Sequence, residues 1–200
     1  MESFDFRGLG VALVTPFDIN GDVDYDRLHL LVNRLVAGGA DYIVVLGTTA
    51  ETPCLTDDEK RRIRESVAEW VGGRVPLVLG FGGNCTAALC EELRAWDGDG
   101  YTAILSVTPF YNKPSQQGLY EHFKAVAEAS PLPVLLYNVP GRTGVNMQPA
   151  AGCLQGLGEH TQALIRDSER RVSADMGLHQ IRGIAFFLCT IYFASKANVF

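Results

Sequence analysis

The most regular feature of the sequence is a repeat of short apolar runs, each followed by a polar loop and then by a longer amphipathic stretch. A short run of consecutive apolar residues bounded by glycine, proline or polar residues is typical of a strand that is buried on both faces. Five such runs precede residue 140, and we expect strands within residues 10–17, 42–46, 75–80, 103–107 and 134–136.

The stretches between these runs carry apolar residues at helical spacing. The first stretch begins at Asp24, a good N-cap residue, and ends before two glycines. In the second, Thr56 is followed three residues later by Glu59, which is the pattern of a capping box. We expect helices over residues 24–37, 56–71, 84–96 and 115–129, and a fifth that begins near residues 148–149.

Strands that alternate with helices build a parallel sheet covered by helices, either as an open doubly wound sheet or as a closed eight-stranded barrel. An open dinucleotide-binding sheet carries the pattern G-x-G-x-x-G after a strand. The loop at residues 15–24 lacks that pattern, and the glycines of residues 80–84 are spaced differently from it. We therefore predict an α/β fold of the TIM (β/α)8-barrel type, of which five to six βα units are present in this chain.

Side chains that can move protons or bind anions follow the ends of the expected strands. Thr48 and Thr49 follow the second run, Tyr111 the fourth, and Tyr137 and Arg142 the fifth. Hydroxyls and phenols can pass a proton, and a guanidinium can hold a carboxylate through two parallel hydrogen bonds. Taken singly, these residues are equally typical of turn-capping threonines, an aromatic lid over the core and a solvated arginine. Because barrel active sites form at the carboxyl ends of strands, their common position favours one site.

Composition and charge exclude several classes of protein. The 200 residues are 47% hydrophobic and 20% charged, as in an ordinary globular protein, and one domain is the first expectation. The net charge of −6 argues against a general nucleic-acid binder. We see no signal peptide and no apolar run long enough to span a membrane. Five cysteines without a C-x-x-C pair favour free thiols, and we predict a cytoplasmic protein.

The sequence shows no pattern typical of a metal or cofactor site. Its histidines are His29, His122, His160 and His179, and none is spaced as a metal ligand would be. We interpret these four as surface or helix residues. We predict no metal and no cofactor.

Four longer motifs then identify a family. They are residues 12–17 (ALVTPF), 47–52 (GTTAET), 106–120 (SVTPFYNKPSQQGLY) and 137–144 (YNVPGRTG). In content, order and spacing they resemble the dihydrodipicolinate synthase (4-hydroxy-tetrahydrodipicolinate synthase) family of the pyruvate-dependent class I aldolase superfamily, over residues 5 to about 151. One departure is Ala50, which stands where the family usually has glycine.

The resemblance implies a (β/α)8 barrel that condenses pyruvate with L-aspartate 4-semialdehyde in lysine biosynthesis by the diaminopimelate route. A lysine forms a Schiff base with pyruvate, whose enamine attacks the aldehyde. By this analogy Thr49 binds the pyruvate carboxylate, Thr48 and Tyr111 relay protons, Tyr137 is the general acid/base and Arg142 holds the semialdehyde carboxylate. The tyrosine that corresponds to Tyr111 acts across a dimer interface in the family, so the resemblance implies a homo-oligomer, usually a dimer of dimers.

The Schiff-base lysine of the family is missing from its expected position. Family spacing places it near Ile165, but no lysine occurs between Lys124 and Lys196. Arg166 does not replace it, because a guanidinium stays protonated and is no nucleophile toward a carbonyl at neutral pH.

The family pattern ends after about residue 151. We therefore divide the chain into residues 1–151, the N-terminal part of a barrel, and residues 152–200, a divergent tail in which a sixth strand is doubtful. Residues 166–171 include five charged side chains, which do not suit a buried strand. Our hypothesis is that the tail reflects a shifted reading frame or a truncated gene. If neither alternative frame of the coding DNA restores a lysine motif near position 165, this hypothesis is wrong.

Three functional hypotheses follow. The first is a 4-hydroxy-tetrahydrodipicolinate synthase-like lyase whose activity is impaired because its Schiff-base lysine is missing. The second is a non-catalytic barrel remnant that binds a keto acid or an intact paralogue. The third is another pyruvate-dependent aldolase, such as an N-acetylneuraminate lyase. Arg142 argues against the third, because its charge suits a short substrate that carries a carboxylate.

Overall fold

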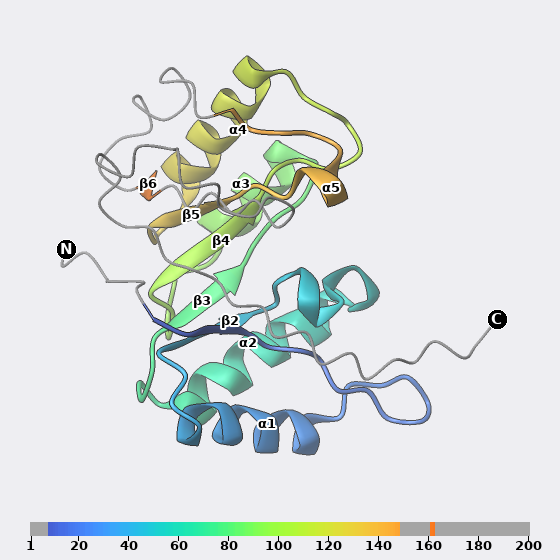
Figure 1. Ribbon diagram of the computed structural model, residues 1–200, viewed down its shortest axis with the longest axis vertical. Helices are drawn as coiled ribbons and strands as arrows, with labels where there is room; N and C mark the ends of the chain where they lie inside the picture. The colour runs from blue at the N-terminus through green and yellow to red at the C-terminus, as the bar shows by residue number, and fades with distance from the viewer. Residues whose placement is uncertain (1–7, 149–160, 163–200) are drawn as a thin grey trace, which may run out of the picture.

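A computed structural model describes residues 8–148 and 161–162 of the chain. Its six strands form one parallel sheet in which each strand pairs with the next along the chain (Figure 1). The strands are β1 (Gly10–Ala12), β2 (Tyr42–Val45), β3 (Leu77–Gly80), β4 (Ala103–Val107), β5 (Val134–Tyr137) and β6 (Thr161–Gln162).

Helices connect the successive strands. They are α1 (Tyr25–Ala37), α2 (Asp57–Val71), α3 (Thr86–Arg94), α4 (Gln116–Ala129) and the single-turn α5 (Pro140–Thr143), with two 3₁₀ turns, η1 (Thr48–Ala50) and η2 (Thr52–Cys54), between β2 and α2. Strands in sequential parallel order with helical crossovers are the arrangement of a (β/α)8 barrel. The predicted fold class is confirmed.

The helices begin where capping side chains satisfy their first free N–H groups. The carboxylate of Asp24 accepts a hydrogen bond from the backbone N–H of Arg27 at 2.9 Å. Both hydrogen bonds of the expected capping box between Thr56 and Glu59 are present. At the start of α4, the Ser115 hydroxyl accepts a hydrogen bond from the backbone N–H of Gly118 at 3.1 Å. These caps explain why three of the four long helices begin at or within one residue of the predicted position, since an uncapped first turn is less stable by about 1 kcal/mol.

The two faces of the sheet carry separate apolar clusters, because successive strand side chains point to opposite faces. One cluster joins strand residues such as Ile43, Leu79 and Ile104 to the buried sides of the helices. The other consists of Tyr42, Val44, Val78, Ala103, Leu105 and Leu135, with Tyr137 packed against it. A strand with both faces buried favours apolar residues on both faces, which is why the strands appear as largely apolar runs; the buried Ser106 in β4 is an exception.

Two details differ from the sequence predictions. The short helix α5 is not among the predicted helices; it begins at Pro140, where the fixed φ of proline suits the first helical position. Helix α3 begins at Thr86 rather than at residue 84. His122 lies on helix α4, as its interpretation as a surface or helix residue allows, and its side chain is only 3% exposed.

Strand β6 pairs with β5 through the partners Val134–Thr161 and Leu135–Gln162, so the sheet has a sixth strand within the region where one was doubtful. The other predictions for the tail, including the boundary at residue 151, the fifth helix near 148–149, His160, Ile165 and His179, fall outside the described residues. Among the residues that the structure describes, no helix is long and apolar enough to cross a membrane.

Candidate functional site

The carboxyl ends of β2, β3, β4 and β5 lie at the same end of the parallel sheet, in a staggered register. Register pairs Val45 with Leu79, Gly80 with Leu105, and Val107 with Tyr137. The loops that follow these strands therefore leave the sheet at one edge, and the short helix α5 lies beside it (Figure 1). All five candidate residues of the sequence analysis are on these loops or at these strand ends.

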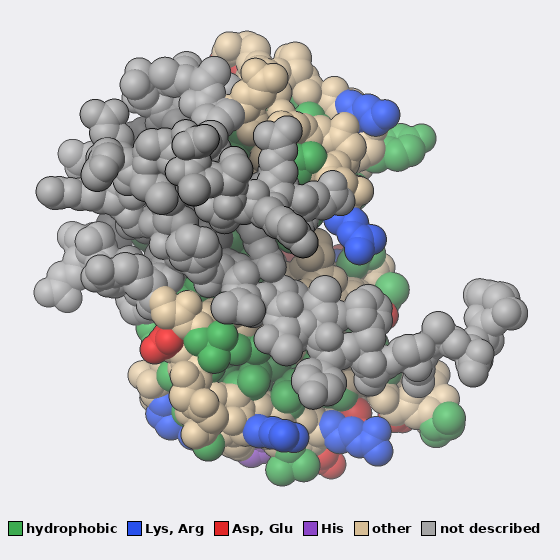
Figure 2. All heavy atoms as spheres, in the orientation of Figure 1, with side chains coloured by type: hydrophobic (Ala, Val, Ile, Leu, Met, Phe, Trp, Pro, Cys, Tyr) green, Lys and Arg blue, Asp and Glu red, His purple; other side chains and the backbone are tan. Residues whose placement is uncertain are grey.

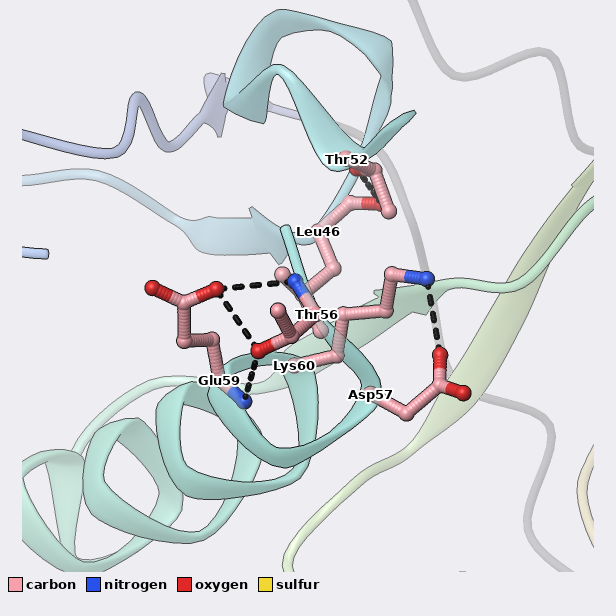
Figure 3. A network of polar contacts seen from close by, with 6 residues as sticks. All are labelled: Leu46, Thr52, Thr56, Asp57, Glu59 and Lys60. Carbon is pink, nitrogen blue, oxygen red and sulfur yellow. Dashed lines mark hydrogen bonds and ion pairs between the residues drawn. The ribbon is translucent and has the colours of Figure 1, made fainter. Parts of the chain in front are cut away.

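Thr48 and Thr49 lie on η1, a turn that two other threonines hold in place. The Thr52 hydroxyl lies 3.0 Å from the carbonyl oxygen of Leu46 and 2.9 Å from that of Gly47, and it donates to this pair of acceptors. Figure 3 shows Thr52 beside Leu46, above the capping box of Thr56 that begins α2. The backbone just before Thr48 is thereby fixed.

From the other side, the buried hydroxyl of Thr15 donates to the carbonyl of Ala50 at 2.8 Å. Thr15 lies beyond the end of β1, so the η1 turn is tied to two neighbouring strands. Within the turn, Thr48 is exposed and Thr49 is half-buried. A half-buried hydroxyl beside fixed backbone amides is suited to bind a small anionic group.

Glycines allow the neighbouring loops to approach closely at this edge. A Cβ atom on Gly80 would lie 2.7 Å from the Cα of Gly47 and closer still to the carbonyl group of Leu46. A Cβ atom on Gly82 would lie 2.6 Å from the side chain of Val107. These contacts connect the end of β2, through the loop after β3, to the end of β4.

Tyr111 follows β4 and lies at the same edge, but its side chain is 87% exposed. Its backbone has a φ of 70°, in the left-handed region that residues other than glycine seldom adopt. The next residue, Asn112, donates a hydrogen bond from its side chain to the carbonyl of Asn84 at 3.1 Å, which ties this loop to the one after β3. The structure thus fixes the backbone beneath Tyr111 while the phenol faces solvent.

Backbone strain gathers in these loops. The non-glycine residues with positive φ among those described are Leu46, Glu51, Tyr111 and Lys113. All four lie in the loops after β2 and β4. Strained backbone persists only where the surroundings enforce it, and it clusters at functional sites. Its distribution supports a functional site at this edge.

Tyr137 and Arg142 come from β5 and from the loop after it. Tyr137 is the last residue of β5, half-buried, and its side chain packs with the cluster that includes Leu135, on the face of the sheet that α1 to α4 do not cover. Arg142 lies on α5, exposed, with its backbone N–H donating to the carbonyl of Val139 at 2.9 Å. The two side chains therefore reach the edge at different depths.

The arrangement combines proton-passing groups at the sheet edge with one guanidinium near the surface. It suits a small substrate with a carboxylate rather than a long anionic polymer, and on the face that Figure 2 shows, Lys and Arg side chains are scattered rather than gathered into one stripe. Within residues 8–148 and 161–162, no group of three or more His, Cys, Asp or Glu side chains is placed to hold a metal ion.

Several residues that shape the site were not predicted from the sequence. Besides Thr15 and Thr52, two carboxamides, those of Gln116 and Asn138, bind the loop that carries Arg142. The sequence signals these four residues only by their position, because each lies at or just beyond the end of a helix or strand. Their partners could not be read from the pattern.

The fold defines a protein of the (β/α)8-barrel class, with its candidate polar residues at the carboxyl edge of the sheet. The sequence matches the model of the Dihydrodipicolinate synthetase family over residues 5–154. The chain belongs to this family.

Similar proteins agree with this assignment. A 4-hydroxy-tetrahydrodipicolinate synthase of Parabacteroides distasonis is 56% identical over 147 residues, which cover 74% of this chain and 50% of that protein. The corresponding protein of Porphyromonas gingivalis is 51% identical over 148 residues, with 74% and 50% covered. The chain therefore spans about half the length of the curated relatives it matches.

Solved structures show the same likeness. The 4-hydroxy-tetrahydrodipicolinate synthase of Methylacidiphilum fumariolicum SolV superposes with a TM-score of 0.74 at 34% identity, covering 82% of this chain and 55% of that one. A monomeric dihydrodipicolinate synthase variant superposes with a TM-score of 0.68 at 42% identity, covering 72% and 48%.

Proposed function

We propose that this edge of the sheet is the substrate site of a 4-hydroxy-tetrahydrodipicolinate synthase-type lyase, which takes pyruvate and L-aspartate 4-semialdehyde. In this proposal Thr49 binds the pyruvate carboxylate and Arg142 binds the carboxylate of the semialdehyde. Thr48 and Tyr111 relay protons, and Tyr137 is the general acid/base. The observation that carries the proposal is that all five residues lie at or just beyond the carboxyl ends of parallel, hydrogen-bonded strands, at one edge of the sheet.

The depths of the two anion-binding groups support this division of roles. Thr49 is half-buried in a turn with a fixed backbone, a setting that suits the smaller keto acid. Arg142 is exposed on α5, where it can meet a second substrate that arrives from solvent. A charge-assisted hydrogen bond to a carboxylate contributes about 1.5–3 kcal/mol, so either group has a measurable share of ligand affinity.

The two roles can be separated by titrating the chain with pyruvate and, separately, with succinic semialdehyde, which keeps the aldehyde and carboxylate of the second substrate. We expect Arg142→Gln to weaken the affinity for succinic semialdehyde about tenfold or more and to leave pyruvate unchanged. Thr49→Val should do the reverse. If each variant lowers the affinities for both ligands equally, or if neither variant lowers either affinity, the assignment of roles is wrong.

We further propose that the chain binds its keto acid without forming the Schiff base. The sequence has no lysine between Lys124 and Lys196, and Arg166 is no nucleophile toward a carbonyl. This gap favours the second candidate function, a non-catalytic barrel that binds a keto acid or associates with an intact paralogue. Turnover of pyruvate and semialdehyde by the purified chain would argue for the catalytic alternative.

The family also suggests a cytoplasmic enzyme that assembles as a homo-oligomer, usually a dimer of dimers. The 87% exposure of Tyr111 supports an assembly, because a half-apolar phenol held on a fixed loop is suited to be covered by a second copy of the chain. A relative described as monomeric shows that the assembly varies. Sedimentation of the purified chain distinguishes the two, and a monomer at every concentration would contradict the proposal.

A further inference from the structure

The loop that carries Arg142 is held by two side-chain carboxamides rather than by strand pairing. It leaves β5 at Asn138, turns through α5 and returns along residues 146–148. The N–H of Gly144, at a φ of 71°, donates to the carbonyl of Pro140 and ends α5. Gly144 is suited to this left-handed position because it has no side chain.

Asn138 holds one edge of the returning segment. It is 3% exposed, and its side-chain oxygen accepts a hydrogen bond from the N–H of Met147 at 3.0 Å. Its side-chain nitrogen donates to the carbonyl of Met147 at 3.3 Å and to the side-chain oxygen of Asn146 at 2.8 Å. The carboxamide therefore pairs with both backbone groups of Met147, as a neighbouring strand would.

Gln116, the first residue of α4, holds the opposite edge. Its side-chain nitrogen donates to the carbonyl of Asn146 at 2.8 Å, and its side-chain oxygen accepts from the N–H of Gln148 at 2.9 Å. In an extended chain, the backbone polar groups of successive residues point to opposite sides. Gln116 takes the groups of residues 146 and 148, and Asn138 takes those of residue 147, so the segment is held from both sides.

Inside the loop, Thr143 adds a third constraint. Its buried hydroxyl lies 3.0 Å from the carbonyl oxygen of Val145 and 3.2 Å from that of Val139. The loop is thus fixed at its start, its turn and its return, while Arg142 remains exposed at its tip. A rigid base reduces the conformational entropy that a ligand must remove when it orders an exposed arginine.

We propose that Gln116 and Asn138 are positioning residues, whose carboxamides hold residues 139–148 so that Arg142 is presented at the carboxyl edge for the carboxylate of the second substrate. This inference rests on the role proposed for Arg142. Neither carboxamide needs to touch a ligand. Loss of either hydrogen-bonded edge should lower the affinity for the second substrate, since a binding group misplaced by about 1 Å contributes far less.

The chain offers a matched control for Gln116. Its neighbour Gln117 is exposed on the same helix turn, and its side chain donates to Glu121 on α4 at 2.8 Å rather than to the loop. We therefore compare Gln116→Met with Gln117→Met. Each variant removes one side-chain carboxamide, and the two positions are adjacent on α4. A second variant, Gln116→Glu, keeps the acceptor for Gln148 but turns an oxygen toward the carbonyl of Asn146.

The experiment measures the affinities of the full chain for succinic semialdehyde and for pyruvate, together with amide hydrogen exchange over residues 139–148. We expect Gln116→Met to lower the affinity for succinic semialdehyde about tenfold and to leave the affinity for pyruvate unchanged. Amide hydrogen exchange at Gln148 should become faster. Gln116→Glu and Asn138→Asp should also lower the affinity for succinic semialdehyde. Gln117→Met should behave like the unaltered chain.

The outcomes separate this inference from the role of Arg142. Suppose that Arg142→Gln lowers the affinity for succinic semialdehyde but that none of the three carboxamide variants does. The positioning role is then overturned, while the role of Arg142 stands. If Arg142→Gln itself has no effect, the role of Arg142 is overturned, and the positioning role with it. An equal loss of affinity for both ligands in Gln116→Met would indicate general damage to the fold and would also overturn the inference.

Discussion

Side chains that touch no substrate in our proposal fix those that do. Thr15 and Thr52 each donate to the backbone of the turn that carries Thr48 and Thr49. A hydroxyl in this position satisfies carbonyl groups that an irregular turn leaves unpaired. At the scale of single residues, the site therefore depends on hydroxyls and carboxamides one step away from the ligand.

Thr52→Val keeps the shape of the side chain and removes its donor. We expect the free energy of unfolding to fall by about 1 kcal/mol, because the carbonyls of Leu46 and Gly47 lose a hydrogen bond. The affinity for pyruvate should fall as well, since the turn before Thr48 loosens. Urea denaturation and pyruvate titration measure the two effects. Thr52→Ser retains the donor and is the control; equal losses in both variants would contradict this explanation.

His122 is a buried histidine whose burial lowers its pKa to about 4 from an ordinary value of 6.5. Its Nδ1 lies 2.8 Å from the hydroxyl of Thr86, which joins α3 to α4. Because the folded pKa lies below the unfolded one, the unfolded chain takes up the proton first as the pH falls. The contribution to stability is full above pH 6.5 and decreases toward pH 4, by up to about 1.4 kcal/mol per pH unit.

We expect His122→Gln, which keeps a partner for Thr86, to flatten the pH dependence of unfolding between pH 6.5 and 4. Urea midpoints measured across this range give the slope. His29→Gln is the matched control, because His29 is an exposed histidine that stacks on Trp70. An unchanged slope in His122→Gln would show that another group titrates.

At the scale of elements, the sequence was most informative where the structure is local. Strands showed as apolar runs because both faces are buried, and helices began where Asp24, Thr56 and Ser115 could cap them. The helix α5 was missed because its proline and glycine are equally typical of a turn. The rule that sites follow strand ends placed all five candidate residues at the observed edge.

Long-range contacts could not be predicted in this way. Gln116 binds residues 146 and 148, which lie 30 and 32 positions further along the chain, and nothing near Gln116 in the sequence indicates that partner. The burial of His122 was missed for a related reason, since its helix packs against α3 as well as the sheet. Local patterns predict elements, whereas tertiary contacts decide which polar residues they bury.

Gly80 tests how closely β2 and β3 must approach at their carboxyl ends. In Gly80→Ala the new methyl group would meet the backbone of Leu46 and Gly47, which cannot rotate away as a side chain can. We expect a loss of about 1–3 kcal/mol in the free energy of unfolding and weaker pyruvate binding. Thermal and urea denaturation give the first quantity.

The control is Gly83→Ala, three residues further along the chain, in the loop after β3. A Cβ atom there would lie 3.5 Å from the side chain of Leu89, an ordinary van der Waals contact. We expect a change within about 0.5 kcal/mol. If Gly83→Ala costs as much as Gly80→Ala, the loop tolerates no side chain at all and the close approach to β2 is not the cause.

At the scale of the whole molecule, the groups proposed to bind and protonate substrate come from β2, β4 and β5 and their loops, all within the described residues. The family resemblance places the Schiff-base amine in a later part of the chain, where this sequence has no lysine before Lys196. Our central claim is that the chain forms the keto-acid site without the nucleophile.

Borohydride reduction in the presence of pyruvate, followed by peptide mass spectrometry, tests this claim most directly. Reduction makes a pyruvate imine permanent, so any lysine that forms one carries added mass. The relative from Parabacteroides distasonis, 56% identical, serves as the positive control. We predict an adduct in that relative and none in this chain. A pyruvate adduct on any lysine of this chain, Lys196 included, would contradict the account.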